Sequence, residues 1–123
     1  MSTPCRALLA ALAALFLLPT SGALADRAPT KQERAGIAKK VGVPARCLRI
    51  RVSTVNTRWA STHVRNARRS CRRWAADGIA VFQRTKAGGW RFVTAGSAFD
   101  CPVPKVPPRV VEDLHIRCSD MGG

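Results

Sequence analysis

The stretch CLRIRVST, residues 47–54, alternates apolar and polar side chains without interruption. Successive side chains of a β-strand point to opposite faces of a sheet, so this period of two predicts a strand with one buried face. The side chains expected inside are Leu48, Ile50 and Val52, and those expected outside are Arg49, Arg51 and Ser53. Such a strand is stable only beside partners that satisfy its backbone groups and cover its apolar face.

Three further segments are predicted to be strands of the same antiparallel sheet. Residues 58–64 follow a turn at Asn56, and residues 79–84 and 90–94 flank a glycine-containing turn, as expected of a hairpin. In residues 58–64 the two expected faces are Ala60, Thr62 and Val64 on one side, and Trp59 and His63 on the other.

Two helices are predicted to flank the strands. Residues 30–33, TKQE, fit a capping box, and the helix that begins there is expected to end at Gly42. Residues 107–108 are prolines, which suit the first turn of a second helix over 109–116. The order helix, four strands, helix predicts a single α+β domain, in which a four-stranded antiparallel sheet is packed by an N-terminal and a C-terminal helix.

Both ends of the chain are expected to lie outside this domain. The apolar run LLAALAALFLL, residues 8–18, follows Arg6 and precedes the small-x-small site Ala23-Leu24-Ala25, so residues 1–25 are predicted to be a signal peptide. The run is too short to span a bilayer, which takes about 20 residues, so the exported protein is not expected to be integral to a membrane. The domain is expected over 26–118, with a frayed tail at 119–123.

The cysteines predict two disulfide bonds, because an even number remains after removal of the signal and the chain is bound for an oxidising compartment. They are Cys47, Cys71, Cys101 and Cys118. Pairing of Cys47 with Cys71 and of Cys101 with Cys118 is favoured over the two other connectivities, because it closes short loops. A metal site is not expected, since no C-x-x-C spacing occurs, and no cofactor is predicted.

The chain is strongly basic, with 21 Lys and Arg against 7 Asp and Glu and a formal net charge of +14. Such an excess favours contact with nucleic acid, envelope or lipid phosphate, or acidic polysaccharide. Arginine outnumbers lysine and tyrosine is absent, which is also the composition expected of a GC-rich genome. Function and base composition therefore both stay open as reasons for the charge.

The densest group of cations is RNARRSCRRW, residues 65–74, with Arg65, Arg68, Arg69, Arg72 and Arg73. An α-helix would place several of them as like-charge neighbours, each costing about 0.2–0.5 kcal/mol, so a loop held by Cys71 is predicted. There Trp74 could either pack on the core or stack beneath a guanidinium. The arginines could bind phosphate, and the ring could also stack on a single-stranded base. A solvated loop without a ligand is the alternative.

Arg49 and Arg51 would form a second cationic row on the outer face of the 47–54 strand. Arg58 and Arg91 could continue that row on neighbouring strands. Outward strand positions are often arginine without any ligand, so an ordinary surface is the competing interpretation.

No catalytic pattern is evident in the sequence. A hydrolase of the ribonuclease type would need His63 and His115, the only two histidines, to flank one phosphate, and nothing local to either predicts that they meet. Glu112 and Asp113 are adjacent, so a helix directs them apart, and their expected place is the positive end of the second helix.

Four segments together resemble a group of small exported proteins of high-GC Gram-positive bacteria: VSTVNTRWA at 52–60, GGWRFVTAGSAF at 88–99, C-x-V-P-x-V-P at 101–107 and V-x-D-L-x-x-x-C at 111–118. That group has no assigned activity, so the resemblance implies export and an α+β fold and no functional residue. The element order is also compatible with a cystatin-like layout, one helix across a curved antiparallel sheet, which says little about function.

The sequence therefore predicts an exported, non-catalytic basic protein that binds a cell-envelope polymer, nucleic acid or acidic protein. The predicted contacts are Arg65, Arg68, Arg69, Arg72 and Arg73, with Arg49, Arg51 and Trp74. Two alternatives remain: a protein-interaction or inhibitor module that uses the proline loop 102–108, and a small basic hydrolase that uses His63 and His115.

Overall fold

The computed structural model describes residues 26–119, so the predicted signal peptide and residues 120–123 of the predicted tail lie outside the described range. One antiparallel sheet has the strand order β1-β2-β3-β4. The strands are β1 Leu48–Val52, β2 Trp59–Val64, β3 Ile79–Arg84 and β4 Trp90–Gly96. The helices are α1 Lys31–Val41 and α2 Pro108–Asp113, with 3₁₀ turns η1 Ala45–Cys47 and η2 Arg69–Trp74. The predicted α+β fold is confirmed.

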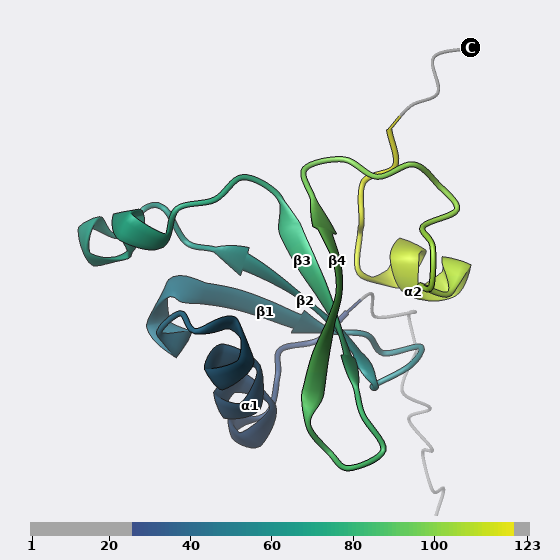
Figure 1. Ribbon diagram of the computed structural model, residues 1–123, viewed down its shortest axis with the longest axis horizontal. Helices are drawn as coiled ribbons and strands as arrows, with labels where there is room; N and C mark the ends of the chain where they lie inside the picture. The colour runs from purple at the N-terminus through teal and green to yellow at the C-terminus, as the bar shows by residue number, and fades with distance from the viewer. Residues whose placement is uncertain (1–25, 120–123) are drawn as a thin grey trace, which may run out of the picture.

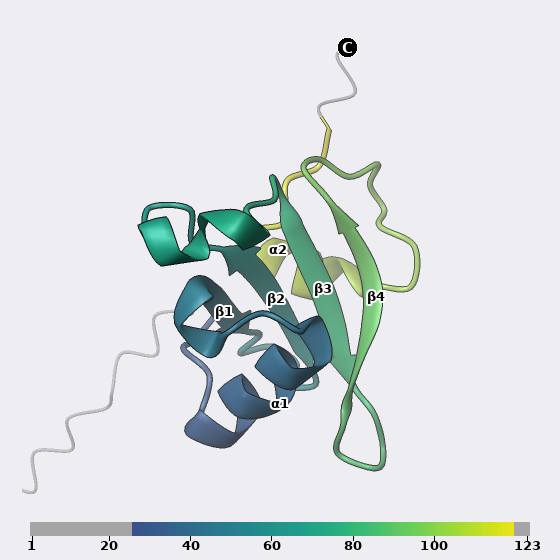
Figure 2. The same ribbon diagram turned by 60° about the vertical axis from the view of Figure 1, so that its left-hand side comes forward.

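The sheet is covered on both faces, by α1 on one side and by α2 on the other (Figure 1). Figure 2 shows α1 in front of the sheet and α2 behind it. The core on the α1 face consists of Ile37, Leu48, Ile50, Val52, Ala60, Phe82 and Trp90. The core on the α2 face consists of Trp59, Val81, Phe99, Val103, Val106, Val110, Val111, Leu114 and Ile116. The one-helix, cystatin-like layout thus describes the α1 face alone.

The covered second face explains why the alternation of side chains misplaced one residue. Ser53 was expected on the outer face, but it is fully buried. Four successive residues of β2 are buried as well, because α2 and the segment before it cover the face that alternation assigns to water. The proline loop takes part in this cover, since Val103 and Val106 point into the core.

Helix α2 ends at Asp113 rather than at Ile116, where the sequence analysis placed its end. The Ile116 amide donates to the Val111 carbonyl at 3.0 Å, and the His115 amide donates to the Glu112 carbonyl at 3.1 Å. These two bonds define a Schellman turn, whose left-handed position is occupied by His115 with a φ of 53°. The turn stops the helix and still leaves Ile116 in the core.

Asp113 lies at the C-terminal end of α2, whereas the sequence analysis placed it near the N-terminal end. Its buried carboxylate accepts from the Thr54 amide at 2.8 Å, the Thr54 hydroxyl at 3.1 Å and the Asp26 amide at 3.2 Å. Burial by itself would raise the pKa of this carboxyl, but hydrogen bonds from Ser53, Thr54 and Asp26 outweigh it and lower the pKa. Asp113 therefore ties α2 to the β1–β2 turn.

Both disulfides form with the favoured connectivity, Cys47–Cys71 between η1 and η2, and Cys101–Cys118 beside α2. Two disulfides in a domain of this size are typical of extracellular proteins. Ser119, the first residue of the predicted tail, donates its amide to the Phe99 carbonyl at 2.7 Å. Within residues 26–119, no helix is both long enough and apolar enough to cross a membrane.

The predicted capping box begins α1. The Glu33 amide donates to the Thr30 hydroxyl at 3.1 Å, and the Thr30 amide donates to the Glu33 carboxylate at 2.8 Å. Arg27 adds two hydrogen bonds to the same carboxylate, at 2.8 and 3.1 Å, and this ion pair lowers the pKa of Glu33 to about 2. Arg27 also forms an isolated β-bridge with Val52 of β1. The ion pair therefore holds the segment before α1 against both the helix and the sheet.

Replacing Glu33 by Gln is expected to lower the free energy of unfolding by about 2 kcal/mol at pH 7, because the partly exposed Arg27 loses its buried partner. The folded pKa of Glu33 is depressed, so its contribution is complete above the ordinary pKa of 4.5 and is lost as pH falls toward 2. Urea denaturation at pH 7 and pH 2 measures the difference. A gap between wild type and Glu33→Gln that stays constant over this range would contradict the assignment.

Candidate anion-binding groove

Residues 65–74 leave the end of β2 and project beyond the strands as a separate lobe (Figures 1 and 2). The sequence predicts a loop here, but Arg69–Trp74 form the 3₁₀ helix η2. An α-helix is absent from this described segment, as expected, and the disulfide of the fully buried Cys71 anchors the lobe. A 3₁₀ helix has three residues per turn, so the arginines are not stacked at the i,i+4 spacing that disfavours an α-helix here.

Five arginines from three places in the sequence line one cleft, with a volume of about 580 Å³. Arg65 and Arg68 come from the segment before η2, Arg49 and Arg51 from β1, and Arg34 from α1. His63 of β2 lies in the same wall. We call this cleft, defined by these six residues, the arginine groove. It contains four of the predicted contacts and adds Arg34 and His63, which the sequence analysis did not assign to it.

Two of the five arginines are already engaged within the protein. Arg51 forms an ion pair with Asp26 and donates from Nε to the Asp26 carboxylate at 2.7 Å. Arg34 donates to the Ala45 carbonyl at 3.4 Å, which leaves its charge uncompensated. Within residues 26–119, no carboxylate pairs with Arg49, Arg65 or Arg68, and all three are exposed. The groove is therefore a concave surface with a large excess of positive charge.

The other four predicted contacts lie outside the groove lining. Arg69, Arg72 and Arg73 are exposed on η2, and the Arg73 guanidinium lies 4.4 Å from the centre of the Trp74 ring. Trp74 thus adopts one of its predicted roles, beneath a guanidinium. The half-buried ring also lines a different cavity, at the end of the sheet. The arginine run is divided between two surfaces.

The predicted continuation of the cationic row across the sheet does not form. Arg58 donates to the Arg84 carbonyl at 3.0 Å, and Arg91 binds the side chain of Gln83. Both arginines therefore serve contacts around β3, and neither lines the arginine groove.

A smaller pocket of about 250 Å³ adjoins the arginine groove and shares Arg49, Arg51 and His63 with it. Its remaining lining residues are Asp26, Ser61, Ile79, Leu114 and His115. We call it the histidine pocket. Both histidines line this pocket because the turn after α2 lies over the face of the sheet to which β2 contributes His63. This long-range relation has no local sequence signal.

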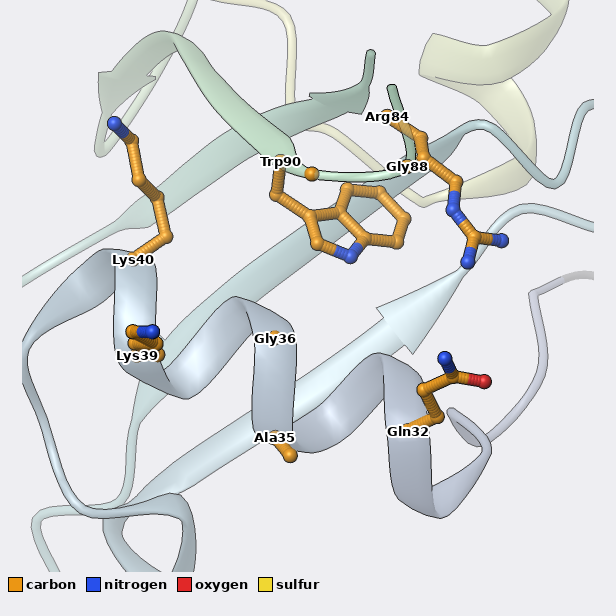
Figure 3. A pocket seen from close by; sticks show the side chains of 9 residues that line it. Gln32, Ala35, Gly36, Lys39, Lys40, Arg84, Gly88 and Trp90 are labelled. Atoms are coloured by element: carbon orange, nitrogen blue, oxygen red, sulfur yellow. The ribbon is translucent and has the colours of Figure 1, made fainter. Parts of the chain in front are cut away.

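A second cationic depression, of about 630 Å³, lies between α1 and the β3–β4 hairpin (Figure 3). Figure 3 shows the Trp90 ring lying over α1 at Gly36, with Arg84 beside it and Lys39 and Lys40 toward the end of the helix. A Cβ atom on Gly36 would lie 3.2 Å from Trp90, so glycine permits this close packing. Since Trp90 is itself buried in the core, the ring's primary role is structural.

Comparison with known proteins gives no relative from which a role could be transferred. No family model matches the chain, and no similar protein was found among the curated sequences or the solved structures.

Proposed function

We propose that the protein is exported and binds an anionic polymer through the arginine groove. The observation that carries this proposal is the convergence of Arg49, Arg65 and Arg68 on one cleft without a carboxylate partner among the described residues. Guanidinium groups bind phosphate and carboxylate oxygens through paired hydrogen bonds, and their fork geometry favours such ligands over water. Three free guanidiniums along one cleft suit a chain of repeated negative charges.

Two features support export. Two disulfides are typical of proteins in an oxidising compartment, and the Asp26 nitrogen lies 3.2 Å from the buried Asp113 carboxylate. Cleavage after Ala25 would convert that amide into the N-terminal ammonium, which places a positive charge against a buried negative one. The predicted cleavage site after Ala25 would thus leave a charged N-terminus beside a carboxylate that can pair with it.

Binding through the arginine groove and nonspecific attraction by the net positive charge predict different affinities for two triple variants. The groove variant changes Arg49, Arg65 and Arg68 to Ser, and the lobe variant changes Arg69, Arg72 and Arg73 to Ser. Both remove three charges from exposed positions. The groove variant is expected to lose affinity for a single-stranded oligonucleotide or heparin on the order of 100-fold, from roughly 1 kcal/mol per lost contact, whereas the lobe variant changes less than about threefold.

Fluorescence anisotropy at fixed salt measures both affinities. Equal losses in the two variants would show that the net charge attracts polyanions without a site. Retained affinity in the groove variant would show that the site lies elsewhere.

A further inference from the structure

The histidine pocket holds two imidazoles to which the binding proposal gives no role. His63 and His115 line one small cavity together with Arg49. Arg49 and His63 are directly opposite each other in the β1–β2 register, so their side chains share a face of the sheet. Two imidazoles and a guanidinium around one cavity are the groups that acid–base chemistry at a phosphate requires.

The fold fixes the tautomer of His63. Its Nδ1 lies 2.7 Å from the Gly78 carbonyl oxygen, and a carbonyl only accepts, so the proton of the neutral ring is on Nδ1. Nε2 is then the nitrogen that can accept a proton from a ligand. A backbone carbonyl on Nδ1 is one of the arrangements that orient a histidine for work at Nε2.

His115 occupies a backbone position for which glycine is the usual residue. The Schellman turn after α2 requires a left-handed residue, and His115 provides it at φ 53°. Glycine would adopt this conformation without the steric cost of a Cβ atom. The turn itself gives no reason for an imidazole, but the pocket does, because His115 lines the cavity that His63 also lines.

We propose that the histidine pocket cleaves RNA. Nε2 of His63 accepts the proton of the ribose 2′-hydroxyl, the 2′-oxygen forms a bond to phosphorus, and the bond from phosphorus to the 5′-oxygen breaks. Protonated His115 gives its proton to the departing 5′-oxygen, and Arg49 stabilises the negative charge on the phosphoryl oxygens. The products are a 2′,3′-cyclic phosphate and a 5′-hydroxyl. His63 ends protonated and His115 neutral, so the step balances without another reactant.

RNA is the substrate class because it supplies its own nucleophile. Among the described residues, the one hydroxyl side chain that lines the pocket is that of Ser61, which is buried in the sheet. This inference rests on the proposed function, since the adjoining arginine groove would hold the strand whose phosphate enters the pocket. It also departs from the expectation of a non-catalytic protein, which rests on the absence of any local sequence sign that His63 and His115 converge.

The test incubates the purified, disulfide-bonded protein with a single-stranded RNA and with DNA of the same sequence, and measures cleavage and binding separately. Wild type is expected to bind both, to cleave only RNA and to release cyclic phosphate ends. His63→Ala and His115→Gly are each expected to lower the cleavage rate at least about 100-fold. His115 lies outside the arginine groove, so His115→Gly should keep the DNA affinity of wild type. His115→Gly should also keep or raise the melting temperature, which a purely structural histidine would not combine with lost cleavage.

Lys105→Gly is the matched control, because Lys105 is the other described non-glycine residue with a positive φ, 66°, and it lies outside the pocket. It should keep the wild-type cleavage rate. Absence of RNA cleavage with intact DNA binding overturns this inference and leaves the binding proposal standing. Cleavage that persists in both histidine variants also overturns it. If wild type binds neither the RNA nor the DNA, the binding proposal is overturned instead.

Discussion

Gly78→Ala is expected to lower the free energy of unfolding by about 3 kcal/mol, the largest effect of any single substitution considered. Gly78 has a φ of 90°, and a Cβ atom there would lie 2.3 Å from the Gly96 carbonyl oxygen. That oxygen belongs to the backbone, so the start of β3 would have to separate from the end of β4. Thermal or urea denaturation measures the loss.

Gly88→Ala provides the matched control, since Gly88 has nearly the same φ, 91°, but nothing within 4 Å of the added Cβ. Its cost is expected to be about 1 kcal/mol, from backbone strain alone. If Gly78→Ala and Gly88→Ala lower the free energy of unfolding equally, the backbone of Gly96 does not lie close to Gly78 in solution. Because the Gly78 carbonyl accepts from His63, Gly78→Ala should also release that ring, visible as a shift of its NMR signals.

Removal of the Cys47–Cys71 disulfide by a double substitution to Ala is expected to cost about 3 kcal/mol, the chain-entropy contribution for a loop of this length. It should also reduce polyanion affinity severalfold. Arg65 and Arg68 lie between the end of β2 and the anchored Cys71, so the groove loses one wall when the anchor is removed. Denaturation and oligonucleotide titration measure the two effects.

The double substitution of Cys101 and Cys118 separates stability from binding. It opens a loop of similar length, so its cost should also be about 3 kcal/mol, but it lies beside α2 and away from Arg65 and Arg68. Affinity should be unchanged at a temperature where the protein remains folded. Equal loss of affinity in both double variants would mean that the lobe does not position the arginines.

The elements of this fold were predictable because their signals are local. Alternation in CLRIRVST placed β1, and the reciprocal bonds of Thr30 and Glu33 placed the start of α1. The disulfides followed from short-loop pairing. The alternation pattern could not predict that α2 packs on the second face of the sheet. That packing buries Ser53 and Trp59.

The site was predictable only in part, for the same reason. Counting arginines in residues 65–74 found Arg65 and Arg68, but it could not separate them from Arg69, Arg72 and Arg73, which lie one or a few residues further on and outside the groove lining. The ion pair of Arg51 with Asp26 and the pocket shared by His63 and His115 depend on how distant segments pack. No sequence spacing records those contacts.

The salt dependence of binding tests the central claim, that the groove rather than the net charge holds the polymer. Each phosphate contact contributes about 0.7 to the slope of log affinity against log salt for a single strand, so three contacts contribute about 2. The groove variant, Arg49, Arg65 and Arg68 to Ser, should have a slope shallower than wild type by this amount, and the lobe variant should keep the wild-type slope. Slopes reduced equally in both variants would contradict the claim.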